Sequence, residues 1–283
     1  MRRVLTVFAA ALAAAALTAP AASAAPEFAS YVALGDSYTS GSLIPNQVDL
    51  LCTRSDRNYP SLVAESLEPG EVTDVSCGGA TTADMTASQL LTSNPPQFDA
   101  LKPDTELVTV GIGGNDVPFA EVVLTCGGMG LLVPHGSPCK DFYTSSGTDG
   151  LAEKVRAAGV KVGAVLAGIH QRSPQAKVVL VGYPTLLPDD GTNCWPLVPI
   201  SDGDAPYLRD VTKLLNTVLA EQAAAHDASF VDTYRSSVGH DMCKAPGVKW
   251  VEGIFPSAPA APVHPNAAGA RNQAAQVLDS LGS

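Results

Sequence analysis

The chain has 283 residues and a formal net charge of −11 at neutral pH. Nucleic acids and anionic membranes are bound through basic surfaces, so this charge balance argues against both as permanent partners. The length suits one large domain, and neither an internal repeat nor a linker divides the sequence.

The first 24 residues predict an export signal. Arg2 and Arg3 precede an apolar, alanine-rich run over residues 4–19, and the small residues Ala22-Ser23-Ala24 follow. This order is typical of a cleavable secretory signal, and the run is too short to be a membrane-spanning helix. We expect cleavage after Ala24, an extracellular location and a single domain over residues 25–283.

Short apolar runs rich in Val, Leu and Ile predict buried strands over residues 31–35, 72–76, 107–112, 177–183 and 229–232. Helical patterns lie over residues 59–67, 83–91, 150–171, 206–226 and 265–281, the last with Pro265 in its first turn. Strands that alternate with helices predict parallel pairing through right-handed crossovers, and hence an α/β/α sandwich.

The first strand leads into a turn that carries a serine. The apolar residues 31–34 end at Gly35-Asp36, and Ser37 follows. A serine placed where a buried strand turns can project its hydroxyl into a cleft, as an esterase nucleophile must. Taken alone, however, the segment favours an Asx-type turn in which Ser37 merely caps the next helix.

Three further positions lie where a site would form. Gly79 follows the second strand, Asn115 follows the third, and His264 lies near the C-terminus. Each alone is more typical of a turn or a helix start. Open α/β sheets bind ligands at the carboxyl ends of their strands, where these residues together supply a nucleophile, a base and oxyanion donors. We interpret Asp36 and Asp116 as structural turn residues.

The four segments resemble the sequence blocks of the SGNH hydrolases, the GDSL esterase and lipase family. They occur in the family's order and span residues 32–266, with Tyr38 where the family name has leucine. The resemblance implies a flavodoxin-like sheet of five parallel strands and an acyl-enzyme mechanism. It makes Ser37 the nucleophile and His264 the general base, and it builds the oxyanion hole from Ser37, Gly79 and Asn115.

The sequence departs from the commonest family pattern beside the histidine. Many relatives carry an aspartate three residues earlier, where this chain has Ala261. A backbone carbonyl can also accept the Nδ1 hydrogen and select the tautomer that leaves Nε2 free. We therefore expect the Pro262 carbonyl to orient His264 in a dyad. The alternative is an acid from another loop, for which the candidates are Asp202, Asp204, Asp241 and Glu252.

The six cysteines follow predicted strands, and their even number in an exported chain favours disulfides. No Cys-x-x-Cys or Cys-x-x-His spacing indicates a metal site, so we expect neither a metal nor another cofactor. If the strand order is flavodoxin-like, 2-1-3-4-5, neighbouring loops predict three pairs, and the family resemblance points to the same ones. These pairs are Cys52–Cys77, Cys126–Cys139 and Cys194–Cys243.

The loops that follow the strands are rich in apolar residues, which favours an acyl chain over a sugar as the bound group. We expect a lipase or phospholipase A type of carboxylesterase, monomeric and in transient contact with a lipid surface. A carbohydrate O-acetylesterase of the same fold is the alternative. An inactive secreted binding protein is a further alternative, which the four intact motif positions disfavour.

Overall fold

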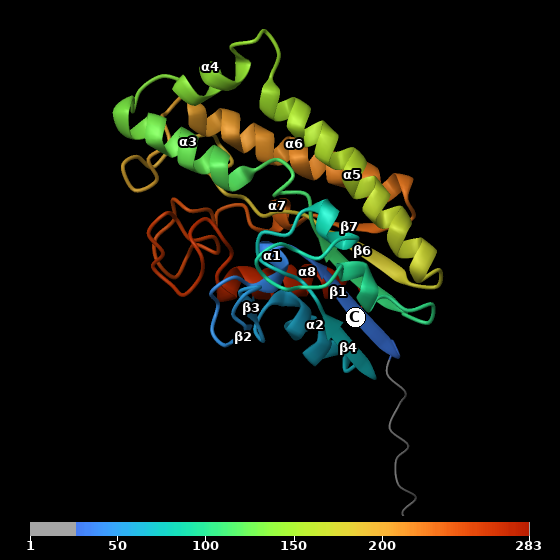
Figure 1. Ribbon diagram of the computed structural model, residues 1–283. Coiled ribbons are helices and arrows are strands. Elements are labelled where there is room, and N and C mark those ends of the chain that lie inside the picture. The colour runs from blue at the N-terminus through green and yellow to red at the C-terminus, as the bar shows by residue number, and fades with distance from the viewer. Residues whose placement is uncertain (1–26, 283) are drawn as a thin grey trace, which may run out of the picture.

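A parallel sheet of five strands forms the centre of the computed structural model, which describes residues 27–282 (Figure 1). The strands are β1 (Ser30–Gly35), β4 (Glu71–Asp74), β5 (Leu107–Gly111), β6 (Lys177–Val181) and β7 (Ser229–Val231). Their order is β4-β1-β5-β6-β7, which confirms both the five predicted strands and the predicted order. The expected burial is wrong for β4, which lies at the edge of the sheet and has no buried residue. The predicted signal lies outside the described residues.

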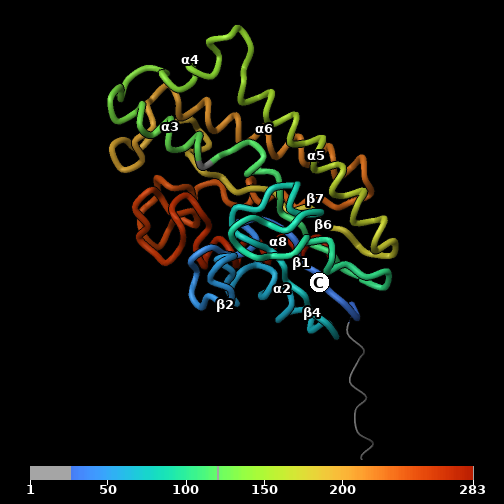
Figure 2. The backbone as a smooth tube through the Cα atoms, in the orientation of Figure 1, coloured from blue at the N-terminus to red at the C-terminus, as the bar shows by residue number. Residues whose placement is uncertain are grey.

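Side chains of the central strands alternate between two apolar cores. In β1, Val32 and Leu34 belong to one core, and Tyr31 and Ala33 belong to the other. The first core lies under α5 (Gly150–Arg172) and α6 (Asp204–Ala225), and the second under α2 (Tyr59–Leu67) and α8 (Ala267–Leu281). Figures 1 and 2 show these helix pairs on opposite faces of the sheet, so the molecule is the predicted three-layer sandwich.

The prediction of a helix over residues 83–91 is wrong. The structure has only a 3₁₀ turn, η1 (Thr82–Met85), followed by loop. Leu90 and Leu91 are 83% and 89% exposed, so the apolar pattern that suggested a helix has no core to pack against. The placement of Pro265 in the first turn of the last helix is also wrong, because Asn266 is the N-cap and accepts from Ala268 and Gly269.

Several elements lie in segments for which the sequence predicted no regular structure. The long connection after β5 contains α3 (Phe119–Leu132) and α4 (Pro138–Thr144). The shorter ones are α1 (Ser37–Ser40), the hairpin of β2 (Gln47–Asp49) and β3 (Arg54–Ser55), η2 (Gln97–Ala100) and α7 (Thr233–Ser236). Helix α3 is apolar on most sides and carries three glycines, so its sequence shows no helical stripe.

Disulfides tie together the loops at the carboxyl edge of the sheet. They join Cys52 to Cys77, Cys126 to Cys139, and Cys194 to Cys243. The second of these links α3 to α4. Among residues 27–282, no helix combines the length and the apolar character that crossing a membrane would require.

The contact between α5 and α6 depends on the absence of a side chain at Gly159. A Cβ atom there would overlap Cγ1 of Val218 on α6, and the stiff valine cannot move aside easily. We expect Gly159→Ala to lower the free energy of unfolding by about 1–3 kcal/mol, because overpacking outweighs the better helix propensity of alanine.

Gly128 in α3 is the matched control, since no atom lies within 4 Å of a Cβ built there. Gly128→Ala should leave stability unchanged or raise it by up to about 1 kcal/mol. Urea unfolding followed by circular dichroism measures both variants. A Gly159→Ala protein as stable as the parent would contradict this account of the α5–α6 contact.

Candidate active site

Ser37 is placed by a sharp turn between β1 and α1. Asp36 is the N-cap of α1, and its side chain accepts from the Tyr38 N–H. Gly35 has a φ of +149°, and a Cβ at this position would lie 2.6 Å from the Gly111 carbonyl oxygen. Only glycine allows this close approach, so Gly35 lets the chain turn and present Ser37 at the carboxyl edge of the sheet.

His264 lies within hydrogen-bonding distance of Ser37. Its Nε2 is 2.7 Å from Ser37 Oγ, and its Nδ1 is 2.7 Å from the Pro262 carbonyl oxygen. Because a carbonyl can only accept, Nδ1 must carry the hydrogen, and Nε2 of the neutral ring is then free to accept from the serine hydroxyl. Burial lowers the pKa of the imidazole, which the hydrogen bond to Pro262 partly opposes.

The four acids considered as alternative partners of His264 are engaged elsewhere. Asp202 accepts from the Gly136 N–H, Asp204 from the N–H groups of Cys139 and Lys140, and Asp241 from the Cys243 N–H. The side chain of Glu252 accepts from Asn266 and Ser257. Within the described part of the chain, none of these four carboxylates is hydrogen-bonded to the imidazole ring of His264.

Asn115 lies at the edge of the same site. Its side-chain Nδ2 donates to the Ala80 carbonyl at 2.8 Å, which uses one of its two hydrogens and leaves the other available. Within residues 27–282, the backbone N–H groups of Ser37 and Gly79 have no protein acceptor. All three groups are therefore free to donate to a negatively charged oxygen.

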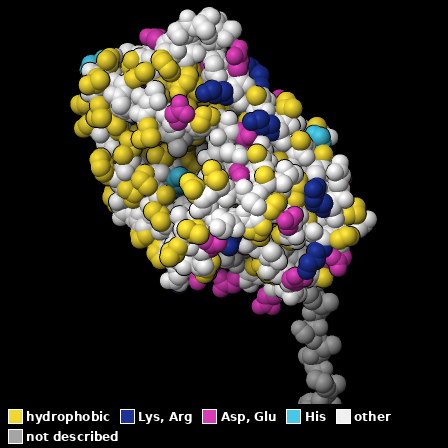
Figure 3. Space-filling model, in the orientation of Figure 1, with side chains coloured by type: hydrophobic (Ala, Val, Ile, Leu, Met, Phe, Trp, Pro, Cys, Tyr) yellow, Lys and Arg dark blue, Asp and Glu magenta, His cyan; other side chains and the backbone are white. Residues whose placement is uncertain are grey.

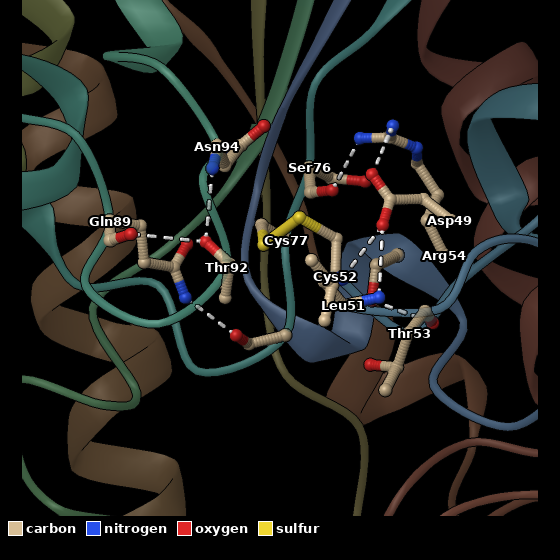
Figure 4. The surroundings of a disulfide bond; sticks show 12 residues. Asp49, Leu51, Cys52, Thr53, Arg54, Ser76, Cys77, Gln89, Thr92 and Asn94 are labelled. Carbon is tan, nitrogen blue, oxygen red and sulfur yellow. Dashed lines mark hydrogen bonds and ion pairs between the residues drawn. A yellow bond between two sulfur atoms is a disulfide. The ribbon is translucent and has the colours of Figure 1, made fainter.

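Gly79 does not line the cavity at Ser37, but its loop is held beside β1. The Cys77 N–H donates to the Gly35 carbonyl at 3.0 Å, and Gln89 Nε2 donates to the Gly78 carbonyl at 2.7 Å. Figure 4 shows Gln89 on one side of the Cys52–Cys77 disulfide and the Arg54–Asp49 pair on the other. Gly79 itself has a φ of +78°, which favours glycine.

A cavity of about 250 Å³ opens at Ser37 and His264. Its walls are mostly apolar and include Phe119, Val123, Leu124, Leu186, Leu215, Ile254 and Val263. A smaller pocket of about 30 Å³ shares Phe119, Leu186 and Ile254 with it and extends the apolar space. The apolar residues of the loop after β1 do not line the cavity. Leu43, Leu50 and Leu51 are exposed, whereas Ile44 is buried.

Asp36 and Tyr183 connect the segment that carries Ser37 to the segment that carries Asn115. The sequence analysis did not predict this connection. The Tyr183 hydroxyl donates to Asp36 Oδ2 at 2.5 Å and accepts from the Gly114 N–H at 2.8 Å. Burial raises the pKa of the Asp36 carboxyl to about 7, although the Tyr183 hydroxyl and the Tyr38 N–H both donate to it. The available signal was the position of Tyr183, at the end of the fourth predicted strand.

Comparisons with known proteins identify a matching family and similar proteins. Residues 33–271 match the model of the GDSL-like Lipase/Acylhydrolase family. Lipase 2 of Streptomyces coelicolor is 41% identical over 100% of this chain and 98% of its own length.

Two solved structures are similar throughout. The phospholipase A1 of Streptomyces albidoflavus has a TM-score of 0.68 and 27% identity, over 90% of this chain and 98% of its own. The extracellular lipase of Streptomyces rimosus has a TM-score of 0.68 and 30% identity, over 89% and 98% of the two chains.

The lowered pKa of His264 sets an expectation for the pH profile. The base accepts a proton only when neutral, so kcat/KM should fall as the pH drops through the pKa of the folded enzyme. We expect this acid limb below the ordinary histidine value of about 6.5. Initial rates on a soluble ester in a pH-stat measure it. A limb near pH 7 would contradict the assignment and point to Asp36, whose pKa is about 7.

Proposed function

We propose that this chain, which belongs to the GDSL-like lipase and acylhydrolase family and is a carboxylic ester hydrolase, cleaves esters of fatty acids outside the cell through a Ser37–His264 dyad. One observation is the main support for this proposal. The Ser37 hydroxyl, 2.7 Å from His264 Nε2, opens onto an apolar cavity of about 250 Å³.

The chemistry follows from the positions of these groups. Ser37 Oγ attacks the ester carbonyl carbon while its proton passes to His264 Nε2. The Ser37 N–H and the Asn115 amide, which border the cavity, donate to the oxyanion that develops, and the family pattern adds the N–H of Gly79. His264 then protonates the leaving alkoxide, the alcohol departs, and an acyl-enzyme remains on Ser37. Water, deprotonated by the same histidine, attacks this ester and releases the acid.

Three features support export, and the single central sheet supports one domain over residues 25–283. The first 24 residues have the composition of a secretory signal, and three disulfides suit an oxidising compartment. A relative that is 30% identical over most of both chains is named an extracellular lipase. We expect the mature enzyme to be a monomer.

The cavity favours a fatty acyl chain over an acetyl group. An acetyl group would leave most of the apolar wall from α3 and the loop after β6 without a ligand, whereas a longer chain buries more apolar surface with each methylene. Each buried methylene stabilises the bound state by about 0.8 kcal/mol. Chain-length preference therefore tests the choice between a lipase and an O-acetylesterase.

A substrate panel makes this test. We expect kcat/KM on p-nitrophenyl esters to rise with acyl length beyond acetate, with turnover of triglyceride or phosphatidylcholine and little release of acetate from acetylated xylan. Ser37→Ala should lower kcat by several orders of magnitude, and Asn115→Ala by roughly 10²–10³. Normal turnover by Ser37→Ala would refute the mechanism, and a preference for acetylated xylan would refute the substrate class.

The rim of the cavity suits contact with a neutral lipid surface. Leu124 of α3 lines the cavity, and Leu131 and Leu132, about two turns further along, are 61% and 84% exposed. Phe255 and Leu197 are exposed on neighbouring loops. Figure 3 shows apolar side chains gathered around a hollow on the side of the molecule where α3 lies. Between residues 119 and 134 the only charged side chain is Glu121, so this rim has no cation to attract anionic lipid.

Replacing two rim leucines tests this contact. Leu131→Gln with Leu132→Gln should lower turnover of emulsified triglyceride several-fold and leave turnover of a soluble short ester unchanged, because neither residue lines the cavity. Leu90→Gln with Leu91→Gln is the control, since both leucines are exposed but lie away from the cavity. Equal losses in both double variants, or stronger binding to phosphatidylglycerol than to phosphatidylcholine vesicles, would contradict the proposal.

A further inference from the structure

Tyr38 connects the segment of the nucleophile to the segment of the base. It follows Ser37 directly, and its hydroxyl donates to the Val263 carbonyl at 2.6 Å, next to His264. Its ring also contacts the histidine, with the two ring centroids 4.8 Å apart. Two residues separated by 225 positions in the chain are thus joined beside the reacting groups.

The segment that Tyr38 holds has a demanding backbone conformation. Val263 has a φ of +65°, a strained region that β-branched residues rarely adopt. Val263 lies between His264 and Pro262, whose carbonyl accepts the Nδ1 hydrogen. A rotation of the backbone at Val263 would therefore move the acceptor and the imidazole relative to each other.

Tyr38 is itself fixed from two directions. Its backbone N–H donates to Asp36 Oδ1 at 2.8 Å, and its ring packs edge-on against Tyr183 with centroids 5.1 Å apart. Tyr183 is held in turn by Asp36 and by the Gly114 N–H. The ring of Tyr38 therefore has little freedom, and burial keeps its hydroxyl protonated by raising its pKa.

We propose that Tyr38 is a positioning residue for the general base: its hydroxyl fixes the Val263 carbonyl and so keeps the Pro262 carbonyl aimed at His264 Nδ1. This inference rests on the proposed dyad, because it assigns to Tyr38 the orientation of that base. Since no acid contacts the ring within residues 27–282, backbone carbonyls orient the histidine, and their own position needs an anchor.

The variant Tyr38→Phe removes only the hydroxyl and keeps the ring against Tyr183 and His264. We expect kcat on a soluble ester to fall about tenfold, the effect of losing roughly one hydrogen bond in the transition state, with KM unchanged. Labelling of Ser37 by a fluorophosphonate should slow by the same factor. The proton NMR signal of His264 Nδ1–H should broaden or disappear, because its acceptor is no longer fixed.

Tyr207→Phe is the matched control. Tyr207 is buried, whereas Tyr38 is partly buried, and the Tyr207 hydroxyl donates to Asp149 Oδ1 at 2.9 Å, away from the cavity. It should lose stability to a similar degree but keep kcat, the labelling rate and the histidine signal. Tyr38→Leu should be at least as slow as Tyr38→Phe, because leucine also lacks the hydroxyl.

The outcomes separate this inference from the function on which it rests. If the parent enzyme is not labelled at Ser37, the dyad itself is wrong. If the parent is labelled and folded Tyr38→Phe retains kcat, the labelling rate and the Nδ1–H signal within twofold, the hydroxyl does not position the base. A fully active Tyr38→Phe beside an inactive Tyr38→Leu would show that only the shape of the ring matters.

Discussion

The structure of the site depends on the hydrogen bonds that the Asp36 carboxylate accepts from neighbouring segments. This carboxylate is buried, and such a group is costly to take out of water unless hydrogen bonds satisfy it. Here one oxygen accepts from the Tyr38 N–H and the other from the Tyr183 hydroxyl, which also receives the Gly114 N–H. The segments that follow β1, β5 and β6 are therefore all hydrogen-bonded, directly or through Tyr183, to the side chain of Asp36.

The loop that carries His264 is held from its other side by a second buried charge. Lys249 and Glu252 form an ion pair at 3.3 Å, and Glu252 also accepts from Asn266, the N-cap of α8. The backbone of Glu252 pairs with Val263 and His264. Because buried ion pairs contribute little net stability, the role we assign to this one is to select a single arrangement of the loop.

The sequence predicted the three central strands and the long helices because their apolar patterns match their burial. It failed at α3, whose glycines and nearly uniform apolar character hide a helix that supplies much of the cavity wall. The prediction also failed at residues 83–91, where Leu90 and Leu91 fit a helical apolar pattern but are exposed. Motif order identified Ser37 and His264, which the structure places in contact. No local pattern could show that Tyr38 meets Val263 or that Tyr183 meets Asp36, because these contacts join distant segments.

The use of the Pro262 carbonyl in place of a carboxylate changes what can lie beside the histidine. A carboxylate at Nδ1 would place a full charge near the acyl chain, and a buried charge is costly unless several hydrogen bonds satisfy it. A carbonyl is only a dipole, already engaged by the ring. The resting dyad is electrically neutral, so hydrocarbon can pack against Val263 and the imidazole without dehydrating an ion. The charge pair of imidazolium and oxyanion then arises only during the reaction, beside a mostly apolar wall.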